Sequence, residues 1–109
     1  MKKANRLTNN ASFSYIYKHG KAVHGAVLAV HFVVAGSIKV GISVSKKIGK
    51  SVIRSKVKRR IKESFRHIIP LLSAKCNYVV SAKEGIAEKD FAYIDKELRA
   101  LLKRVKHLD

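Results

Sequence analysis

Positive charge is concentrated in the middle of the chain, where it could bind phosphate groups. Seven cations and a single anion lie between Arg54 and Arg66. On a helix, like charges four residues apart, such as Lys58 and Lys62, destabilise each other, and a bound polyanion would make the same charges favourable. The pattern therefore indicates a phosphate-binding surface rather than an ordinary solvated helix face. We assign to this basic surface Lys46, Lys47, Lys50, Arg54, Lys56, Lys58, Arg59, Arg60, Lys62 and Arg66.

The turn before this run resembles a nucleotide-binding loop only in part. The tripeptide Gly49-Lys50-Ser51 matches the end of a P-loop, but that motif requires a glycine five residues before Gly49, where this chain has Val44. We therefore exclude a P-loop. The lysines of the turn precede an expected helix whose free N–H groups also favour phosphate.

No residue pattern predicts bond-breaking chemistry by the chain itself. Cys76 is the only cysteine, which excludes an intrachain disulfide and a cysteine-based zinc cluster. Helix capping and the helix dipole account for the acidic residues Glu84, Glu88 and Asp90. Four histidines share no metal-ligand spacing: His19, His24, His67 and His107. We expect no catalytic residue, no metal ligand and no cofactor bound by the protein.

The whole chain is strongly basic. Lys and Arg number 24 and Asp and Glu number 7, which gives a formal net charge of +17. Self-repulsion destabilises a compact chain with so much charge of one sign, so the composition favours a polyanionic partner, above all nucleic acid. The length of 109 residues and the hydrophobic fraction of 47% suit one domain with its own core, which we expect to span residues 1–109.

The sequence favours a soluble, cytoplasmic protein without a membrane partner. The N-terminal run MKKANRL is not followed by the apolar stretch of a signal peptide. The longest apolar-rich stretch, 26–35, is too short to span a bilayer. A single cysteine is typical of a reducing compartment.

The N-terminal half predicts an arm, one helix and two or three strands. Residues 1–9 are polar and basic, and Asn9 or Asn10 can cap a helix that runs to about Lys18. We expect Gly20 to close this helix in a left-handed conformation. The valine-rich span 23–34 predicts one long strand, bent at Gly25, and residues 38–44 alternate as a half-buried strand does.

The C-terminal half predicts a long helix, a strand and a final helix. Ser51 can cap the long helix, which should end near Ile69 because Pro70 follows. We expect a strand over 78–82 and a helix over 91–105 that Asp90 caps. The complete order indicates one α+β layer structure. In the long helix, one apolar stripe should pack on the sheet, formed by Ile53, Val57, Ile61, Phe65 and Ile68.

Two runs resemble the bacterial ribonuclease P protein family. The central run is SVSKKIGKSVIRSKVKRRIKESFR, and in this family a Ser-Lys-Lys turn leads into an Arg-Asn-Arg helix. The N-terminal run NRLTNNASFSYIYKHG resembles the family's opening helix, and the resemblance covers nearly the whole chain. One departure is Arg54-Ser55-Lys56, which lacks the amide and the second planar guanidinium. It affects contacts that depend on that geometry and leaves general phosphate attraction intact.

The resemblance implies a fold and a function. The fold would be a single-domain, two-layer α+β sandwich with a small, mainly antiparallel sheet, like the second domain of ribosomal protein S5. Its strand–helix–strand unit would have the rare left hand, which periodicity cannot show. The chain would be the protein subunit of the endoribonuclease ribonuclease P, and would assist the catalytic RNA in removing the 5′ leader of precursor tRNA.

The resemblance also implies partners and a second set of site residues. The RNA subunit would carry the chemistry with its Mg²⁺, and the partners would be this RNA and precursor tRNA, with no obligate protein partner. Phe13 and Tyr17 lie four residues apart and match two aromatic residues that line a cleft for the single-stranded leader. Core packing is the alternative for that pair, and an ordinary sheet histidine is the alternative for His31, the third candidate.

Two other functions share some of these features. A structural RNA-binding protein of the ribosomal type would have the same charge and size without needing a leader cleft. A module for anionic membranes would need large apolar anchors on its basic helix. The apolar stripe of that helix is instead needed to cover the sheet.

Overall fold

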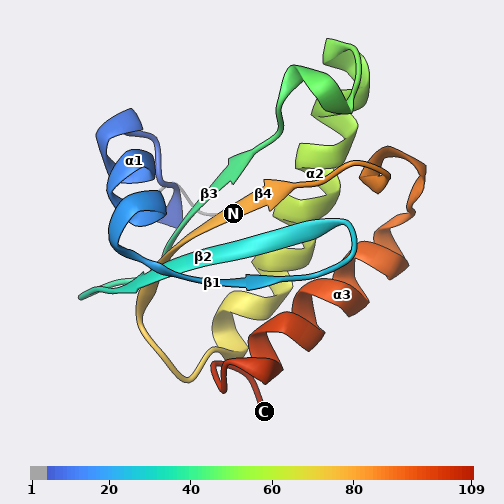
Figure 1. Ribbon diagram of the computed structural model, residues 1–109. Helices are drawn as coiled ribbons and strands as arrows, with labels where there is room; N and C mark the ends of the chain where they lie inside the picture. The colour runs from blue at the N-terminus through green and yellow to red at the C-terminus, as the bar shows by residue number, and fades with distance from the viewer. Residues whose placement is uncertain (1–4) are drawn as a thin grey trace.

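The structure, a computed structural model, describes residues 5–109, so residues 1–4 of the expected arm lie outside the described part (Figure 1). Its order of helices and strands is the α+β order that the sequence predicts. The elements are α1 (Asn10–His19), β1 (Lys21–His24), β2 (Leu28–Val34), β3 (Lys39–Ser43), α2 (Ser51–Ile68), β4 (Cys76–Ala82) and α3 (Phe91–Arg104). Short 3-10 turns lie at η2 (Lys46–Ile48), η3 (Ile69–Leu71) and η4 (Ile86–Glu88).

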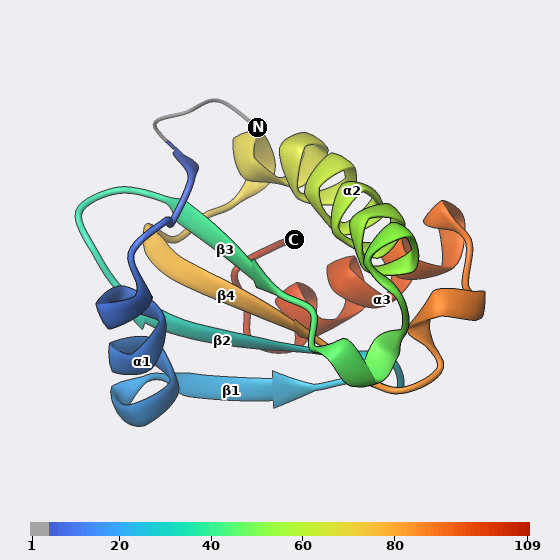
Figure 2. The same cartoon turned by 90° about the horizontal axis from the view of Figure 1, so that it is seen from above.

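The strands form one mixed, mostly antiparallel sheet in the order β1-β2-β4-β3. The β1–β2 and β2–β4 pairs are antiparallel, whereas β3 and β4 are parallel neighbours. Parallel neighbours need a crossover connection, and α2 provides it. Figures 1 and 2 together show that this crossover has the left hand that the family resemblance implies.

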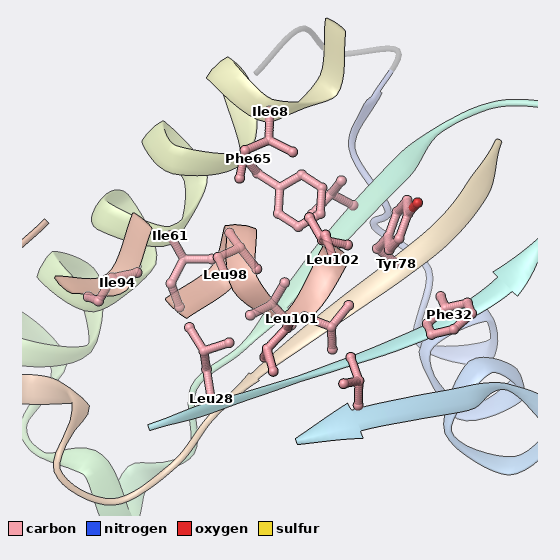
Figure 3. Close-up of a cluster of buried hydrophobic side chains, with 14 of the residues drawn as sticks. Leu28, Phe32, Ile61, Phe65, Ile68, Tyr78, Ile94, Leu98, Leu101 and Leu102 are labelled. Atoms are coloured by element: carbon pink, nitrogen blue, oxygen red, sulfur yellow. The ribbon is translucent and has the colours of Figure 1, made fainter. Parts of the chain in front are cut away.

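Helices α2 and α3 cover one face of the sheet and enclose the main core (Figure 3). Alternate residues of β2 and β4 point into it, because successive side chains of a strand point to opposite faces. Burial of these large apolar side chains is the main force that holds the two helices on the sheet. The core includes Leu28, Phe32, Ile61, Phe65, Ile68, Tyr78, Ile94, Leu98, Leu101 and Leu102.

Helix α1 lies against the opposite face. Its buried Ile16 belongs to a smaller apolar cluster with Leu7 and Val79. Val79 points away from the main core because its neighbours in β4 point into it. Helix α1 spans only part of this face (Figure 2), and His31 and Ser81 remain partly exposed on it.

The first described residues are not a free arm, so that prediction is wrong for residues 5–7. The N–H of Leu7 donates to the carbonyl oxygen of Val40 at 3.0 Å, and Nδ2 of Asn5 donates to that of Ile38 at 2.8 Å. Leu7 is buried in the cluster under α1. The segment therefore lies along the outer edge of β3, where it satisfies backbone groups that an edge strand leaves unpaired.

The first helix is capped as predicted but ends differently. Oδ1 of Asn9 accepts a hydrogen bond from the N–H of Ala11 at 2.8 Å. Gly20 has an extended conformation with φ −80°, so the predicted left-handed closure is wrong. A glycine is needed there for space, because a Cβ would collide with the carbonyl oxygens of Ile16 and Phe32.

The single strand predicted over 23–34 is wrong, because the chain reverses at 25–27 to form the β1–β2 hairpin. The carboxylate of Glu97 holds this loop from α3. Its Oε1 accepts from the N–H of Ala26 at 3.1 Å, and its Oε2 accepts from Val27 at 3.0 Å and Leu28 at 3.1 Å. Valine content could not indicate this reversal, since the loop depends on a side chain some 70 residues away.

Helix α2 keeps most of its predicted apolar stripe. Val57, Ile61, Phe65 and Ile68 are buried, but Ile53 is 38% exposed and lies beside Gly49 instead of on the sheet. The N-cap is Lys50, so the prediction of Ser51 as cap is wrong.

The last two elements differ from their predictions only at their ends. Strand β4 begins at Cys76, two residues earlier than predicted. Asp90 caps α3 as predicted, since its Oδ1 accepts from the N–H of Tyr93 at 2.9 Å. The helix ends at Arg104, one residue before the predicted Val105.

Candidate nucleic-acid interface

Phe13 stands at the point where α1 meets β3. Its half-buried ring lies over Gly41, where a Cβ would collide with it, so the glycine permits this close approach. The ring borders a pocket of about 170 Å³. The pocket is lined by Arg6, Leu7, Thr8, Phe13, Val40, Gly41, Ile42, Lys58 and Lys62.

Two lysines of the basic helix border the same pocket. Lys58 and Lys62 belong to α2, which covers the other face of the sheet but runs alongside the β3 edge (Figure 2). A lysine can lay its apolar stem along such an edge and keep its ammonium group in water. The structure therefore brings a predicted leader-binding ring together with two predicted phosphate-binding residues from a distant part of the chain.

Tyr17 lies one turn further along α1 and is 43% exposed. Its hydroxyl group shares a hydrogen bond with Oγ of Ser81 at 2.8 Å. Its ring meets that of His31 edge to face, with centroids 4.7 Å apart, and His24 lies 6.1 Å beyond His31. We use the name aromatic cleft for the stretch of sheet face on which Phe13, Tyr17 and His31 lie, with the pocket of Phe13 at one end.

His31, in the aromatic cleft, is half-buried. Burial lowers the pKa of its imidazole below the ordinary 6.5, and the nearby charges of His24 and Lys83 lower this pKa further. The ring is therefore neutral at pH 7. A neutral ring can stack on a base or exchange a hydrogen bond with it.

The turn before α2 presents exposed cations beside a helix N-terminus. Lys46, Lys47 and Lys50 are all exposed, and among residues 5–109 the N-cap of α2, Lys50, makes no side-chain hydrogen bond to the first turn. Gly49 shapes the turn with φ 155°, a conformation that other residues rarely adopt. This arrangement suits phosphate, because both the lysines and the free N–H groups attract an anion.

The other predicted cations differ in their exposure to solvent and in the hydrogen bonds that they already make. Lys56, Lys58 and Arg59 are exposed, whereas Arg54, Arg60 and Lys62 are half-buried. Nη1 of Arg60 already donates to the carbonyl oxygen of Lys89 at 3.0 Å. Nε of Arg54 is buried and finds no hydrogen-bond partner within the described part of the chain.

Arg66 is engaged by the one acidic residue of the basic run. Its guanidinium donates to both oxygens of Glu63, at 2.6 and 3.2 Å, and His67 lies 3.1 Å from the same carboxylate. Hydrogen bonding to Arg66 lowers the pKa of Glu63 from 4.5 to about 2, so the carboxylate is charged at neutral pH. Arg66 is consequently less available to an external phosphate than its exposed neighbours.

Sequence reasoning missed two parts of the interface. Residues 6–8 line the pocket of Phe13, and His24 extends the row of rings beyond His31. Leu7, an apolar residue in a polar segment, was a usable signal for the first part, but nothing in the sequence paired His24 with His31. Across residues 5–109, no three His, Cys, Asp or Glu side chains are grouped to hold a metal ion, and no helix has the length and apolar character needed to cross a membrane.

Known proteins resemble this chain over nearly its whole length. The family model described as Ribonuclease P matches residues 1–106. The ribonuclease P protein component of Clostridium novyi is 36% identical, over 95% of this chain and 96% of that relative. The one from Caldanaerobacter subterraneus subsp. tengcongensis is also 36% identical, over 94% of this chain and 90% of the relative.

Solved structures agree with these sequence relatives. The RNase P protein of Staphylococcus aureus has a TM-score of 0.89 at 32% identity, and the match covers 98% of this chain and all of that one. The RNase P protein of Thermotoga maritima has a TM-score of 0.84 at 31% identity, over 93% of this chain and 97% of that one. The fold described above is therefore shared with both proteins.

Proposed function

Because this chain belongs to the bacterial ribonuclease P protein family, we propose that its basic surface binds the RNA subunit of ribonuclease P and that its aromatic cleft binds the 5′ leader of precursor tRNA. Membership makes the chain the protein component of an endoribonuclease of tRNA processing, and implies an RNase P RNA as its partner. What we propose is which residues bind the RNA subunit and which bind the leader.

The pocket that Phe13 shares with Lys58 and Lys62 carries the proposal. A single-stranded nucleic acid presents base faces and phosphates in alternation, and proteins bind it with aromatic platforms beside cations. Core packing alone would not require two lysines around the exposed side of the ring. The structural RNA-binding alternative would not require an aromatic cleft.

Stacking suits the leader because every base has a π-face. Phe13 can offer the side of its ring that borders the pocket, and the exposed ring of Tyr17 stands one turn away. Each stacked base contributes about 1–3 kcal/mol whatever its sequence. A cleft of this kind accepts leaders of many sequences.

The exposed cations of the η2 turn and α2 provide the second contact. Lys46, Lys47 and Lys50 flank the uncapped start of α2, and Lys56 and Arg59 extend the positive surface along the helix. Docking of this surface on RNA would release counterions and relieve the self-repulsion of a chain with net charge +17.

Bond breaking belongs, in this proposal, to the RNA subunit. The Mg²⁺ ions held by that RNA would supply the metal chemistry of hydrolysis. The chain's own residues bind and orient: the lysines reduce repulsion between two polyanions, and the rings hold the leader. The protein thus raises the affinity of the holoenzyme for precursor.

The test is a cleavage assay at reduced Mg²⁺, where RNA–RNA repulsion is least screened. Purified chain, RNase P RNA and precursor tRNA are mixed, and release of the leader is followed. We expect the chain to stimulate cleavage and the Lys58→Ala/Lys62→Ala variant to stimulate less. The control Lys75→Ala/Lys103→Ala removes two exposed lysines outside the basic surface and should match the parent. Cleavage by the chain without RNA, or no stimulation, would refute the proposal.

A further inference from the structure

A second groove lies at the end of the β1–β2 hairpin, between the hairpin loop and α3. Its volume is about 350 Å³, and its walls include Gly25 from the loop and Tyr93, Lys96 and Arg104 from α3. Tyr93 is 38% exposed, and both cations are exposed. We call this the α3 groove. It combines an accessible ring with two cations, as the pocket of Phe13 does.

A row of contacts connects the aromatic cleft to the α3 groove. The ring of Tyr17 contacts His31, whose ring lies 6.1 Å from that of His24. His24 is the exposed last residue of β1, an edge strand of the sheet. Its carbonyl oxygen accepts a hydrogen bond from Nη1 of Arg104 at 3.3 Å. His24 therefore lies between the two: its ring neighbours His31 of the aromatic cleft, and its carbonyl oxygen is bonded to Arg104, which lines the α3 groove.

The charge of the groove is positive despite the presence of Glu97. Both carboxylate oxygens of Glu97 accept hydrogen bonds from N–H groups of the hairpin loop, so this charge is directed into the loop. Lys96 and Arg104 line the groove, and Nζ of Lys89 lies 4.6 Å from the centre of the Tyr93 ring. Among the residues that line the groove, the two cations Lys96 and Arg104 outnumber the single acid, Glu97.

We propose that the α3 groove binds upstream nucleotides of the same single-stranded leader, which passes over His24 at the edge of the sheet. This inference rests on the proposed function of the aromatic cleft. A base stacks on Tyr93, and phosphates lie between Lys96 and Arg104. The groove offers one ring for stacking and two cations for phosphates. Neither contact depends on which base is present, so the groove suits a leader of variable sequence.

The experiment measures how holoenzyme affinity for precursor tRNA depends on leader length. Leaders of about four and about twelve nucleotides lie within the range of single-stranded binding sites. With the parent chain, the longer leader should bind more tightly. Tyr93→Ala and Lys96→Ala should each weaken binding of the long-leader precursor by about five-fold or more and leave the short-leader precursor unchanged. Tyr93→Phe keeps the ring and should retain the parent affinity.

Two controls share the same helix without lining the groove. Phe91→Ala removes an exposed ring, and Lys103→Ala removes an exposed lysine, and neither should change the effect of leader length. Circular dichroism and binding to RNase P RNA without substrate check that each variant is folded.

The outcomes separate the groove from the cleft. If Phe13→Ala weakens binding of the short-leader precursor while the groove variants leave both lengths unchanged, the α3 groove is refuted and the cleft stands. If Phe13→Ala has no effect on either precursor, the proposed function itself fails. If the groove variants weaken both precursors and mature tRNA equally, the groove does not bind the leader.

Discussion

The ring of Phe13 lies over Gly41, and no other residue type fits at position 41 without moving it. This contact joins α1 to β3 and sets the position of a ring that borders the same pocket as Lys58 and Lys62. The geometry of the proposed leader site therefore depends on the absence of a side chain in a strand.

Gly41→Ala should displace the ring of Phe13 from its position in this site. The added Cβ collides with the ring, which must move, and such overpacking costs about 1–3 kcal/mol of stability. We expect a lower free energy of unfolding in urea and weaker binding of leader-bearing precursor. Gly36→Ala is the matched control, because a Cβ there meets no atom of residues 5–109 within 4 Å and should change stability by less than about 0.5 kcal/mol. Equal effects of the two substitutions would contradict the packing relationship.

Glu63→Gln should strengthen binding to RNase P RNA. The substitution removes the carboxylate that pairs with Arg66, and so releases one cation to the basic surface. We expect tighter binding and a steeper dependence on salt, by up to about one unit of log–log slope. Glu84→Gln changes net charge equally at an exposed position before α3 and should have a smaller effect. A greater gain from Glu84→Gln would show that the pair does not restrain Arg66.

Stability should fall as pH drops below about 6.5, in part because of His31. Burial and nearby positive charge hold the pKa of His31 below 6.5 in the folded chain, whereas the unfolded chain keeps the ordinary value. Between these two values the unfolded state binds more protons, so the free energy of unfolding decreases with decreasing pH. His31→Gln should flatten this decrease in urea titrations between pH of about 7.5 and about 5. An unchanged slope would exclude His31 as its source.

Glu97→Gln should loosen the β1–β2 hairpin. An amide offers one oxygen in place of two and places an N–H₂ group against backbone donors. Leaving such groups unsatisfied costs about 1–3 kcal/mol, measurable as a lower urea midpoint. Glu84→Gln, at an exposed residue, is the control and should stay within about 0.5 kcal/mol of the parent. A parent-like midpoint for Glu97→Gln would contradict the role of this carboxylate.

Local patterns in the sequence predicted the features that depend on residues close together in the chain. The stripe from Val57 to Ile68, the caps at Asn9 and Asp90 and the core-facing side of β3 all follow from side-chain period or from a neighbour within a few residues, whereas the burial of Gly41 on the other side of β3 does not. The cations of residues 46–66 were also visible as a run, since their significance lies in charge rather than in geometry.

Long-range contacts could not be predicted in the same way. The hairpin at 25–27 is held by Glu97, the ring of Phe13 lies over Gly41, and the N–H of Leu7 donates to Val40. None of these pairs shares a period or a local motif. The left-handed crossover came only from the family resemblance, because periodicity carries no information on hand.

Binding of the leader by the rings of the cleft can be measured by comparing two substrates. Affinities of the reconstituted holoenzyme for precursor tRNA and for mature tRNA are measured with the parent chain, Phe13→Ala and Tyr17→Ala, and with Tyr17→Phe as a control that keeps the ring. We expect each alanine variant to lose about 1–3 kcal/mol of binding free energy for precursor alone, and Tyr17→Phe to stay close to the parent. Equal losses for precursor and mature tRNA would show that these rings only pack the fold and do not bind the leader.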